Sequence, residues 1–169
     1  MKTLGVLIVL IVLAMGAGLA FIYSGIYNVA ANHPDNGLVT WILQTTSDRS
    51  AQRHARGLTA PDLTGADTIR AGLKDYHALC AVCHGEPGSA ATEIGQGLNP
   101  SAPGLAESAT ELSPGRLFWV TRNGIKMTGM PAFGDTRSPQ QIWSIVAFLT
   151  RLPALTPEAY QAQVRALPK

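Results

Sequence analysis

A long stretch without charge at the N-terminus constrains this 169-residue chain more than any other feature. No residue from Thr3 to Asn32 is charged, and an apolar helix of about 20 residues already spans the hydrocarbon core of a bilayer. The hydrophobic part of a secretory signal peptide is roughly 7–15 residues long, which is shorter than the run from Leu4 to Ile22. We therefore expect residues 1–32 to be an uncleaved transmembrane anchor, with a cleaved signal peptide as the alternative. The remainder of the chain is exported in both cases.

In the rest of the chain, capping residues and prolines mark the starts of several short helices, as in a small helical protein. Residues 33–66 are expected to hold an amphipathic helix, capped by Asp35 or Asn36, and a linker. A further helix should run from about Asp67 into the cysteine-containing stretch. Three later helices should begin where a capping hydroxyl precedes a proline at the first helical position, namely at Ser113-Pro114, Ser138-Pro139 and Thr156-Pro157.

No segment alternates with the period of a strand, so the expected fold class is all-α. Residues 67–155 should form the main domain, and residues 156–169 a short C-terminal helix and tail. Glycine and proline are frequent from Gly85 to Pro114, and this part is expected to be a loop. Basic and acidic residues balance from Leu58 onward, so the chain lacks the basic excess of a nucleic-acid-binding domain.

Both cysteines lie in the stretch LCAVCHGEPG, where His84 directly follows Cys83. A reactive dithiol needs a thiolate stabilised at a helix N-terminus, whereas this pair lies toward the C-terminal end of an expected helix. A structural zinc site needs four ligands, and the chain has no third cysteine. A disulfide between Cys80 and Cys83 would close a loop too short to add much stability.

Covalent attachment of haem uses all three residues of the motif, because C-x-x-C-H is the signature of c-type haem attachment. Cysteines three residues apart on a helical turn point the same way and can form thioethers to two vinyl groups of one haem. The following residue, His84, is then placed to bind the iron. We expect one haem c, bound covalently through Cys80 and Cys83, and export of the chain supports this expectation.

A second axial ligand is expected in the stretch NGIKMTGMPAFG, which holds two methionines. A thioether ligand has to be held on a stiff loop. Met130 is braced by Gly129, which allows close backbone approach, and by Pro131, which fixes φ. Met127 has no such bracing and is expected to pack in the core. We therefore predict that Met130 binds the iron.

Four motifs in a fixed order carry a resemblance to a known family. RAGLKDYHALCAVCHG, APGL, GMPAFG and QIWSIVAFLTRL follow one another between Thr68 and Leu152. In this respect the chain resembles the class I c-type cytochromes, in particular small bacterial domains similar to those of cbb3-type oxidase subunits. The resemblance implies a small helical domain around one covalent haem. The segment Glu86–Gly97 has no clear counterpart in that pattern.

The resemblance also implies particular contacts. Gly72 and Tyr76 should lie where the N-terminal helix of the domain crosses its C-terminal helix, and the Pro103 carbonyl should accept a hydrogen bond from His84. The expected partners on the C-terminal helix are Trp143, Val146, Ala147 and Phe148. Among the remaining residues, His77 is expected to face solvent or to cover a haem edge, and Trp119 to pack in the core.

The function implied is electron transfer and not catalysis. A membrane-anchored cytochrome would cycle one electron at a haem ligated by His84 and Met130 and relay it between respiratory or dehydrogenase partners. Its partners would be redox proteins, membrane lipid through the N-terminal helix, and other membrane subunits, with no nucleic acid. It would lie in a bacterial inner membrane with the haem domain in the periplasm. The alternatives are a haem subunit fixed in a larger membrane oxidoreductase, and a haem catalyst or gas sensor with labile Met130 ligation.

Overall fold

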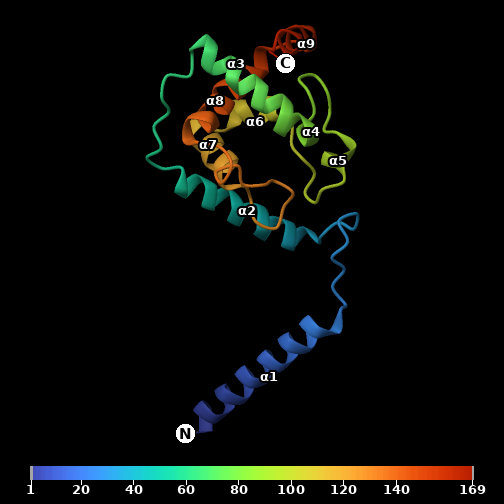
Figure 1. Cartoon of the computed structure of the whole chain (residues 1–169). Helices are drawn as coiled ribbons and strands as arrows, with labels where there is room; N and C mark the ends of the chain where they lie inside the picture. Colours follow the sequence, from blue (N-terminus) through green and yellow to red (C-terminus); the bar gives the residue numbers. More distant parts are fainter. Residues whose placement is uncertain (1, 169) are drawn as a thin grey trace. The chain divides into compact units, whose positions relative to one another are not determined.

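The computed structural model describes residues 2–168 and contains no β-strand in that range (Figure 1). The expected all-α fold class is therefore confirmed. The elements are α1 (Lys2–Ser24), α2 (Gly37–His54), α3 (Ala66–Asp75), the π-helical turn η1 (Tyr76–Cys80), α4 (Ala81–His84), α5 (Glu93–Gln96), α6 (Leu105–Glu111), α7 (Pro114–Asn123), α8 (Pro139–Leu149), the 3-10 turn η2 (Leu152–Ala154) and α9 (Pro157–Arg165).

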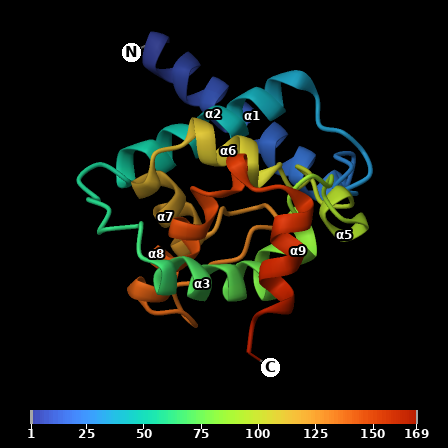
Figure 2. The ribbon, with the colours of Figure 1, turned by 90° about the horizontal axis from the view of Figure 1, so that it is seen from above.

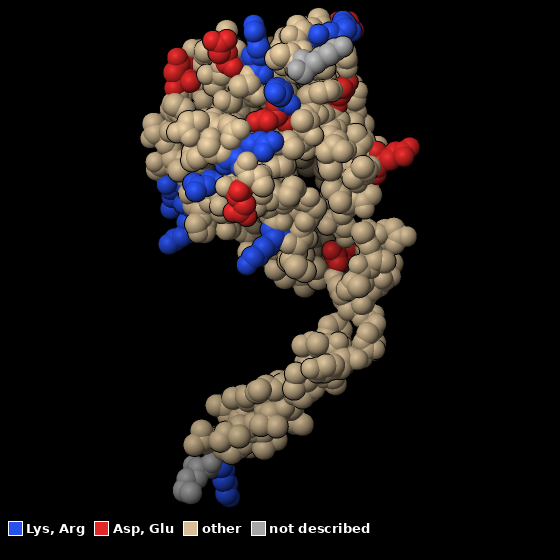
Figure 3. Space-filling model, viewed as in Figure 1, with Lys and Arg blue, Asp and Glu red and all other residues tan. Residues whose placement is uncertain are grey.

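The chain forms two compact units, and the boundary between them lies between His33 and Pro34. The first unit contains α1, whose 23 residues make a helix about 35 Å long at 1.5 Å per residue. By length and composition, this helix could cross a membrane. Lys2 is its only charged residue, and the space-filling view shows an otherwise uncharged surface along this helix (Figure 3).

Four helices of the second unit begin at side-chain caps that the sequence led us to expect. The Asn36 side chain accepts a hydrogen bond from the Val39 amide at the start of α2. Ser113, Ser138 and Thr156 each accept a bond from an amide of the first turn of the helix that follows. Ser138 also forms a capping box, because its own amide donates to the Gln141 side chain at 2.9 Å.

The expectation of a loop from Gly85 to Pro114 is wrong in two places, where α5 and α6 form. The four residues of α5 are held by Thr92, whose side chain caps the Gly95 amide at 3.2 Å. The seven residues of α6 have the sequence LAESATE and follow Gly104. Both helices are short, and helices of this length depend on tertiary contacts for their stability.

The core of the second unit is built where α3 crosses α8, side by side in both views (Figures 1 and 2). At Gly72 a β-carbon would lie 1.8 Å from the Ser144 carbonyl oxygen, so only glycine allows the two helices to come this close. Beside this contact the rings of Tyr76 and Phe148 lie 5.0 Å apart. The crossing expected at Gly72 and Tyr76 is confirmed. Trp143, on another face of α8, stacks on Phe118 of α7 at 4.2 Å.

Helix α9 belongs to the same core. Tyr160 is fully buried, and its ring lies 6.1 Å from that of Tyr76. Its hydroxyl lies 2.9 Å from Nδ1 of His77. The His77 side chain is half-exposed. Its contact with the Tyr160 hydroxyl means that it does not simply face solvent. Burial raises the pKa of Tyr160 to about 12, so the hydroxyl stays protonated at neutral pH.

Candidate haem site

The two cysteines lie at the end of the helical segment formed by α3, η1 and α4. Cys80 ends the π-helical turn and is buried, Cys83 lies in α4 and is half-buried, and both are free thiols. Burial raises the pKa of the Cys80 thiol to about 12, with a smaller effect from Asp75. Such a thiol is a poor thiolate nucleophile and a poor zinc ligand. The described residues also contain no group of three or more His, Cys, Asp or Glu side chains that could hold a metal ion.

His84 is oriented by a single backbone carbonyl. Its Nδ1 lies 2.8 Å from the Pro103 carbonyl oxygen, so Nδ1 carries the proton and donates the hydrogen bond. The expected contact between these two residues is present. This bond fixes the tautomer, because a proton on Nδ1 leaves the Nε2 lone pair free for a metal.

A sharp turn follows His84 and is held from the core. Gly85 has a φ of 78°, a conformation that favours glycine, and a β-carbon there would lie 2.3 Å from the Ala90 carbonyl oxygen. The Tyr76 hydroxyl donates a 2.8 Å hydrogen bond to the Gly85 carbonyl. Burial raises the pKa of Tyr76, so this donor stays protonated. The α3–α8 crossing is therefore linked directly to the position of the candidate ligand.

Thr92 is a positioning residue that the sequence analysis missed. Its hydroxyl donates to the Val82 carbonyl at 2.6 Å, and its amide donates to the Cys83 carbonyl at 3.1 Å. The last carbonyls of a helix have no partner within the helix, and Thr92 supplies one for two of them. The only signal in the sequence was a threonine three residues before Gly95, which is typical of a helix cap.

Met130 lies in a loop that is bound back to the end of α7. The Ile125 amide donates to the Met130 carbonyl at 3.2 Å, and the Gly134 amide donates to the Arg122 carbonyl at 2.8 Å. At Gly129 a β-carbon would lie 2.5 Å from the end of the Leu98 side chain. Met130 itself is half-buried.

The expectation that Met127 packs in the core is wrong. Its side chain is 93% exposed, and its φ of 60° is unusual for a residue with a side chain. It lies at the tip of the turn that brings Met130 back toward α7, where the Thr128 amide donates to the Ile125 carbonyl. The two methionines of the loop therefore have very different surroundings.

These residues fit a covalently bound haem. Two free thiols lie three residues apart at a helix end, and the histidine after them has its Nδ1 occupied and its Nε2 available. A haem bound there would be held by Cys80 and Cys83, with His84 on the iron. Met130, whose carbonyl is held by the Ile125 amide, is a thioether that could complete the ligand set.

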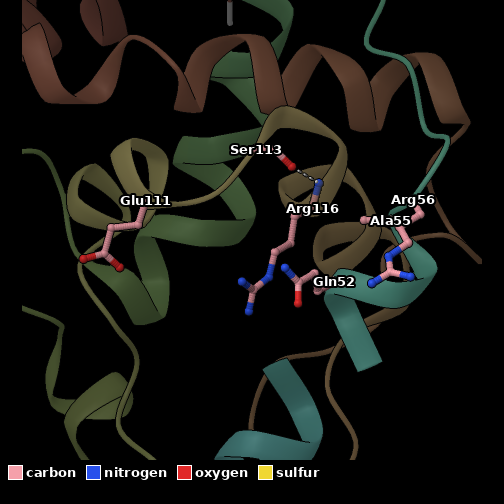
Figure 4. A pocket seen from close by; sticks show the side chains of 6 residues that line it. All are labelled: Gln52, Ala55, Arg56, Glu111, Ser113 and Arg116. Carbon is pink, nitrogen blue, oxygen red and sulfur yellow. Dashed lines mark hydrogen bonds between the residues drawn. The ribbon is translucent and has the colours of Figure 1, made fainter. Parts of the chain in front are cut away.

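One pocket lies away from these residues, between the C-terminal end of α2 and the junction of α6 and α7 (Figure 4). It is an open pocket of about 400 Å³ with mostly polar walls. In Figure 4 the side chains of Gln52 and Arg116 lie close together, and Glu111 lies apart from them. The residues that line it are Gln52, Ala55, Arg56, Glu111, Ser113 and Arg116. None of the candidate haem-binding residues is among them.

Comparison with known proteins agrees with the geometry. Residues 67–149 match the family described as cytochrome C oxidase, cbb3-type, subunit III. No curated protein and no solved structure gives a significant match. The matched range begins in α3, includes the cysteine motif and the Met130 loop, and ends at the last residue of α8. Residues 67–149 therefore form a class I c-type cytochrome domain, similar to the cytochrome c domains of cbb3-type oxidases, and such domains bind haem and transfer electrons.

Proposed function

We propose that the protein is a membrane-anchored electron carrier with one haem c, linked through Cys80 and Cys83 and ligated by His84 and Met130. Residues 1–32 are its anchor in a bacterial inner membrane, and residues 67–155 are its haem domain in the periplasm. The observation that carries the proposal is the 2.8 Å hydrogen bond from Nδ1 of His84 to the Pro103 carbonyl. A histidine with this second contact is oriented as metal-ligating histidines are in proteins.

Each residue has a separate task in this proposal. When bound, the haem supplies an iron that carries one electron. Pro103 keeps the imidazole in one orientation and increases its donor strength. The Met130 thioether, a soft ligand, favours the reduced metal and raises the reduction potential. Because Pro131 fixes φ after Met130 and the Ile125 amide holds the Met130 carbonyl, the thioether should stay in place in both oxidation states.

A variant of the proposed ligand tests the assignment, and the chain offers a matched control. Met130→Ala should remove the weak red absorption band of iron–methionine bonding in the oxidised protein and lower the reduction potential. Carbon monoxide should then bind readily to the reduced protein. Met127→Ala changes the same side chain three residues away, where it is 93% exposed, and should alter none of these properties. Loss of the band in Met127→Ala, with the band kept in Met130→Ala, would refute the assignment.

Covalent attachment is tested separately. A denaturing gel stained for haem peroxidase activity should show a band at the mass of the chain, and Cys83→Ala should abolish normal maturation. Extraction of the haem into acidified acetone would contradict a thioether link. The anchor is tested by washing membranes at alkaline pH, after which the intact chain should remain in the pellet. A mature N-terminus near Asn32 would instead show that a signal peptide is removed.

A second candidate is a haem subunit held permanently in a larger membrane oxidoreductase. It is favoured by the family description, which names a subunit of an oxidase. Purification of the full chain in mild detergent distinguishes the two. A carrier elutes alone and passes electrons in transient contacts, whereas a fixed subunit elutes with its partner polypeptides in constant proportion.

A further inference from the structure

Helix α2 lies outside the matched family range but is fixed to the haem domain. The Asp48 carboxylate and the Arg116 guanidinium of α7 form an ion pair at 2.6 Å. Six residues further along α2, the His54 ring stacks on Trp119 of α7 at 5.4 Å. Ala51 lies between these contacts and is 3% exposed. The expectation that Trp119 packs in the core is therefore replaced by a contact with α2, and α2 moves with the haem domain.

The opposite face of α2 carries apolar residues followed by basic residues. At 100° per residue, Ile42 lies half a turn from Ala51 around the helix. Leu38, Arg49 and Arg53 lie within about 40° of Ile42, so the four residues form one line along the helix. All four side chains are exposed. We call this line, together with Trp41 and Leu43 on its two flanks, the outer face of α2.

The outer face has the chemistry of an interfacial helix. Its four apolar side chains, Leu38, Trp41, Ile42 and Leu43, are each 46–65% exposed. Asp48 is the one acidic residue within α2, and it is paired with Arg116. Neither Arg49 nor Arg53 has an ion pair among the described residues. An apolar face with a tryptophan inserts at the headgroup level, and arginines bind lipid phosphates.

The short linker limits how far the start of α2 can lie from the end of α1. Residues 25–36 join the end of α1 to the start of α2, and even fully extended they reach only about 40 Å. Turns within the linker shorten that reach, since the Ile26 amide bonds the Ser24 hydroxyl and the His33 amide bonds the Ala30 carbonyl. This step rests on the proposed function, in which α1 spans the membrane.

We propose that the outer face of α2 lies on an anionic bilayer surface and holds the haem domain in one orientation above the membrane. The contacts of Asp48 and His54 transmit the orientation, because they join α2 to α7 and so to the loop that follows it. A single anchor with a linker would leave the domain free to rotate. With α2 on the lipid, the haem domain presents the same side to every membrane-bound redox partner.

Spin labels on the full haem-loaded chain test the contact. Cysteines are introduced at Leu38 or Ile42, and at Gln163 on α9 as an exposed control, and the protein is placed in vesicles. The vesicles are phosphatidylcholine alone, or equal parts phosphatidylcholine and phosphatidylglycerol. Oxygen collects in lipid and a neutral nickel chelate stays in water, so the ratio of their collision rates with the label reports depth. The chain without an added cysteine is the blank.

The labels at Leu38 and Ile42 should show a ratio severalfold higher than the label at Gln163, and higher still with anionic lipid. An arginine near an anionic surface strengthens binding roughly fivefold, so Arg49→Gln with Arg53→Gln should weaken the contact roughly thirtyfold in anionic vesicles. Arg70→Gln with Lys74→Gln removes two exposed charges elsewhere and should leave the ratio unchanged.

Three results would overturn the proposal, and each has a separate meaning. If the protein floats with the vesicles but the labels at Leu38 and Ile42 collide with the nickel chelate as often as the control label does, the lipid contact is contradicted. The anchor is not contradicted by this result. Labels shielded from both reagents only in native membranes show that a protein covers the outer face instead. Protein that does not float with either vesicle contradicts both the contact and the anchor.

Discussion

The crossing of α3 and α8 gives the sharpest test of the fold, through the substitution Gly72→Ala. The added β-carbon would lie 1.8 Å from the Ser144 carbonyl oxygen and 3.0 Å from the Phe148 β-carbon. Ordinary contacts begin at 3.4 Å, so the helices would have to move apart by more than 1 Å. A backbone carbonyl inside a helix cannot rotate away, and the buried side chains around it would lose contact.

The cost follows from two opposing effects. Overpacking of a well-filled core costs about 1–3 kcal/mol, and a clash with backbone belongs at the upper end. Alanine in place of glycine within a helix returns up to about 1 kcal/mol. The expected net loss is about 2 kcal/mol, which corresponds to a fall in Tm of about 5–10 °C for a domain of this size.

The measurement is thermal unfolding of the full haem-loaded chain in detergent, followed by the helical circular dichroism signal. Gly104→Ala is the matched control, because nothing lies within 4 Å of the position of its β-carbon and its φ is negative. Its Tm should change little. If Gly72→Ala unfolds at the same temperature as Gly104→Ala, the two helices do not approach as closely as the structure has them.

Three further changes have distinct expected results. Thr92→Val removes the 2.6 Å bond to the Val82 carbonyl and the cap of α5, and should cost about 1–3 kcal/mol in urea unfolding. Tyr160 is protonated in the folded state up to a pKa of about 12, above its ordinary value of 10.0. Its contribution to stability is therefore full below pH 10 and is lost as the pH rises toward 12, and Tyr160→Phe should flatten the fall in urea midpoint over this range. Asp48→Asn breaks the ion pair with Arg116, and trypsin should then cleave at Arg53 faster.

Each of these changes has its own control and its own refutation. The control for Thr92→Val is Thr110→Val, which alters a surface threonine of α6 that bonds only the Glu107 carbonyl. If Thr110→Val lowers the free energy of unfolding as much as Thr92→Val does, the bonds of Thr92 do not stabilise the fold specifically. An unchanged alkaline slope in Tyr160→Phe would show that another group titrates there. Glu107→Gln removes an exposed acid elsewhere, and trypsin should cleave it at the wild-type rate.

Local chemistry explains which elements could be predicted from the sequence. A helix start needs only a hydroxyl, a proline and a following glutamine, so Ser138 and Gln141 identify α8 without any tertiary information. The crossing at Gly72 was available only through the resemblance, since nothing local distinguishes that glycine from others. Helix α5 was missed because its four residues depend on Thr92 bonding carbonyls ten residues earlier.

The burial of single side chains was predicted less well, because residue type alone does not determine it. A methionine is usually buried, yet Met127 occupies the tip of a turn. A tryptophan in the middle of α7 suggests a core position, yet Trp119 meets His54 from a helix that no family pattern covers. For Trp119 the deciding neighbour is α2, whose position cannot be derived from local sequence, whereas for Met127 it is the local turn from Ile125 to Thr128.

The two proposed iron ligands, His84 and Met130, share one structural feature: each is in or follows a helix that ends at a glycine with positive φ. His84 ends α4 and Met130 follows α7, and each of these helices stops at a glycine with positive φ, 78° at Gly85 and 63° at Gly124. At each glycine the returning chain occupies the space of a β-carbon, at 2.3 Å from the Ala90 carbonyl oxygen and 2.7 Å from that of Met130. Main-chain contacts thus fix the ends of α4 and α7, from which His84 and Met130 would meet a bound haem. Under the proposed ligation, little backbone movement would then accompany electron transfer, as an electron carrier requires.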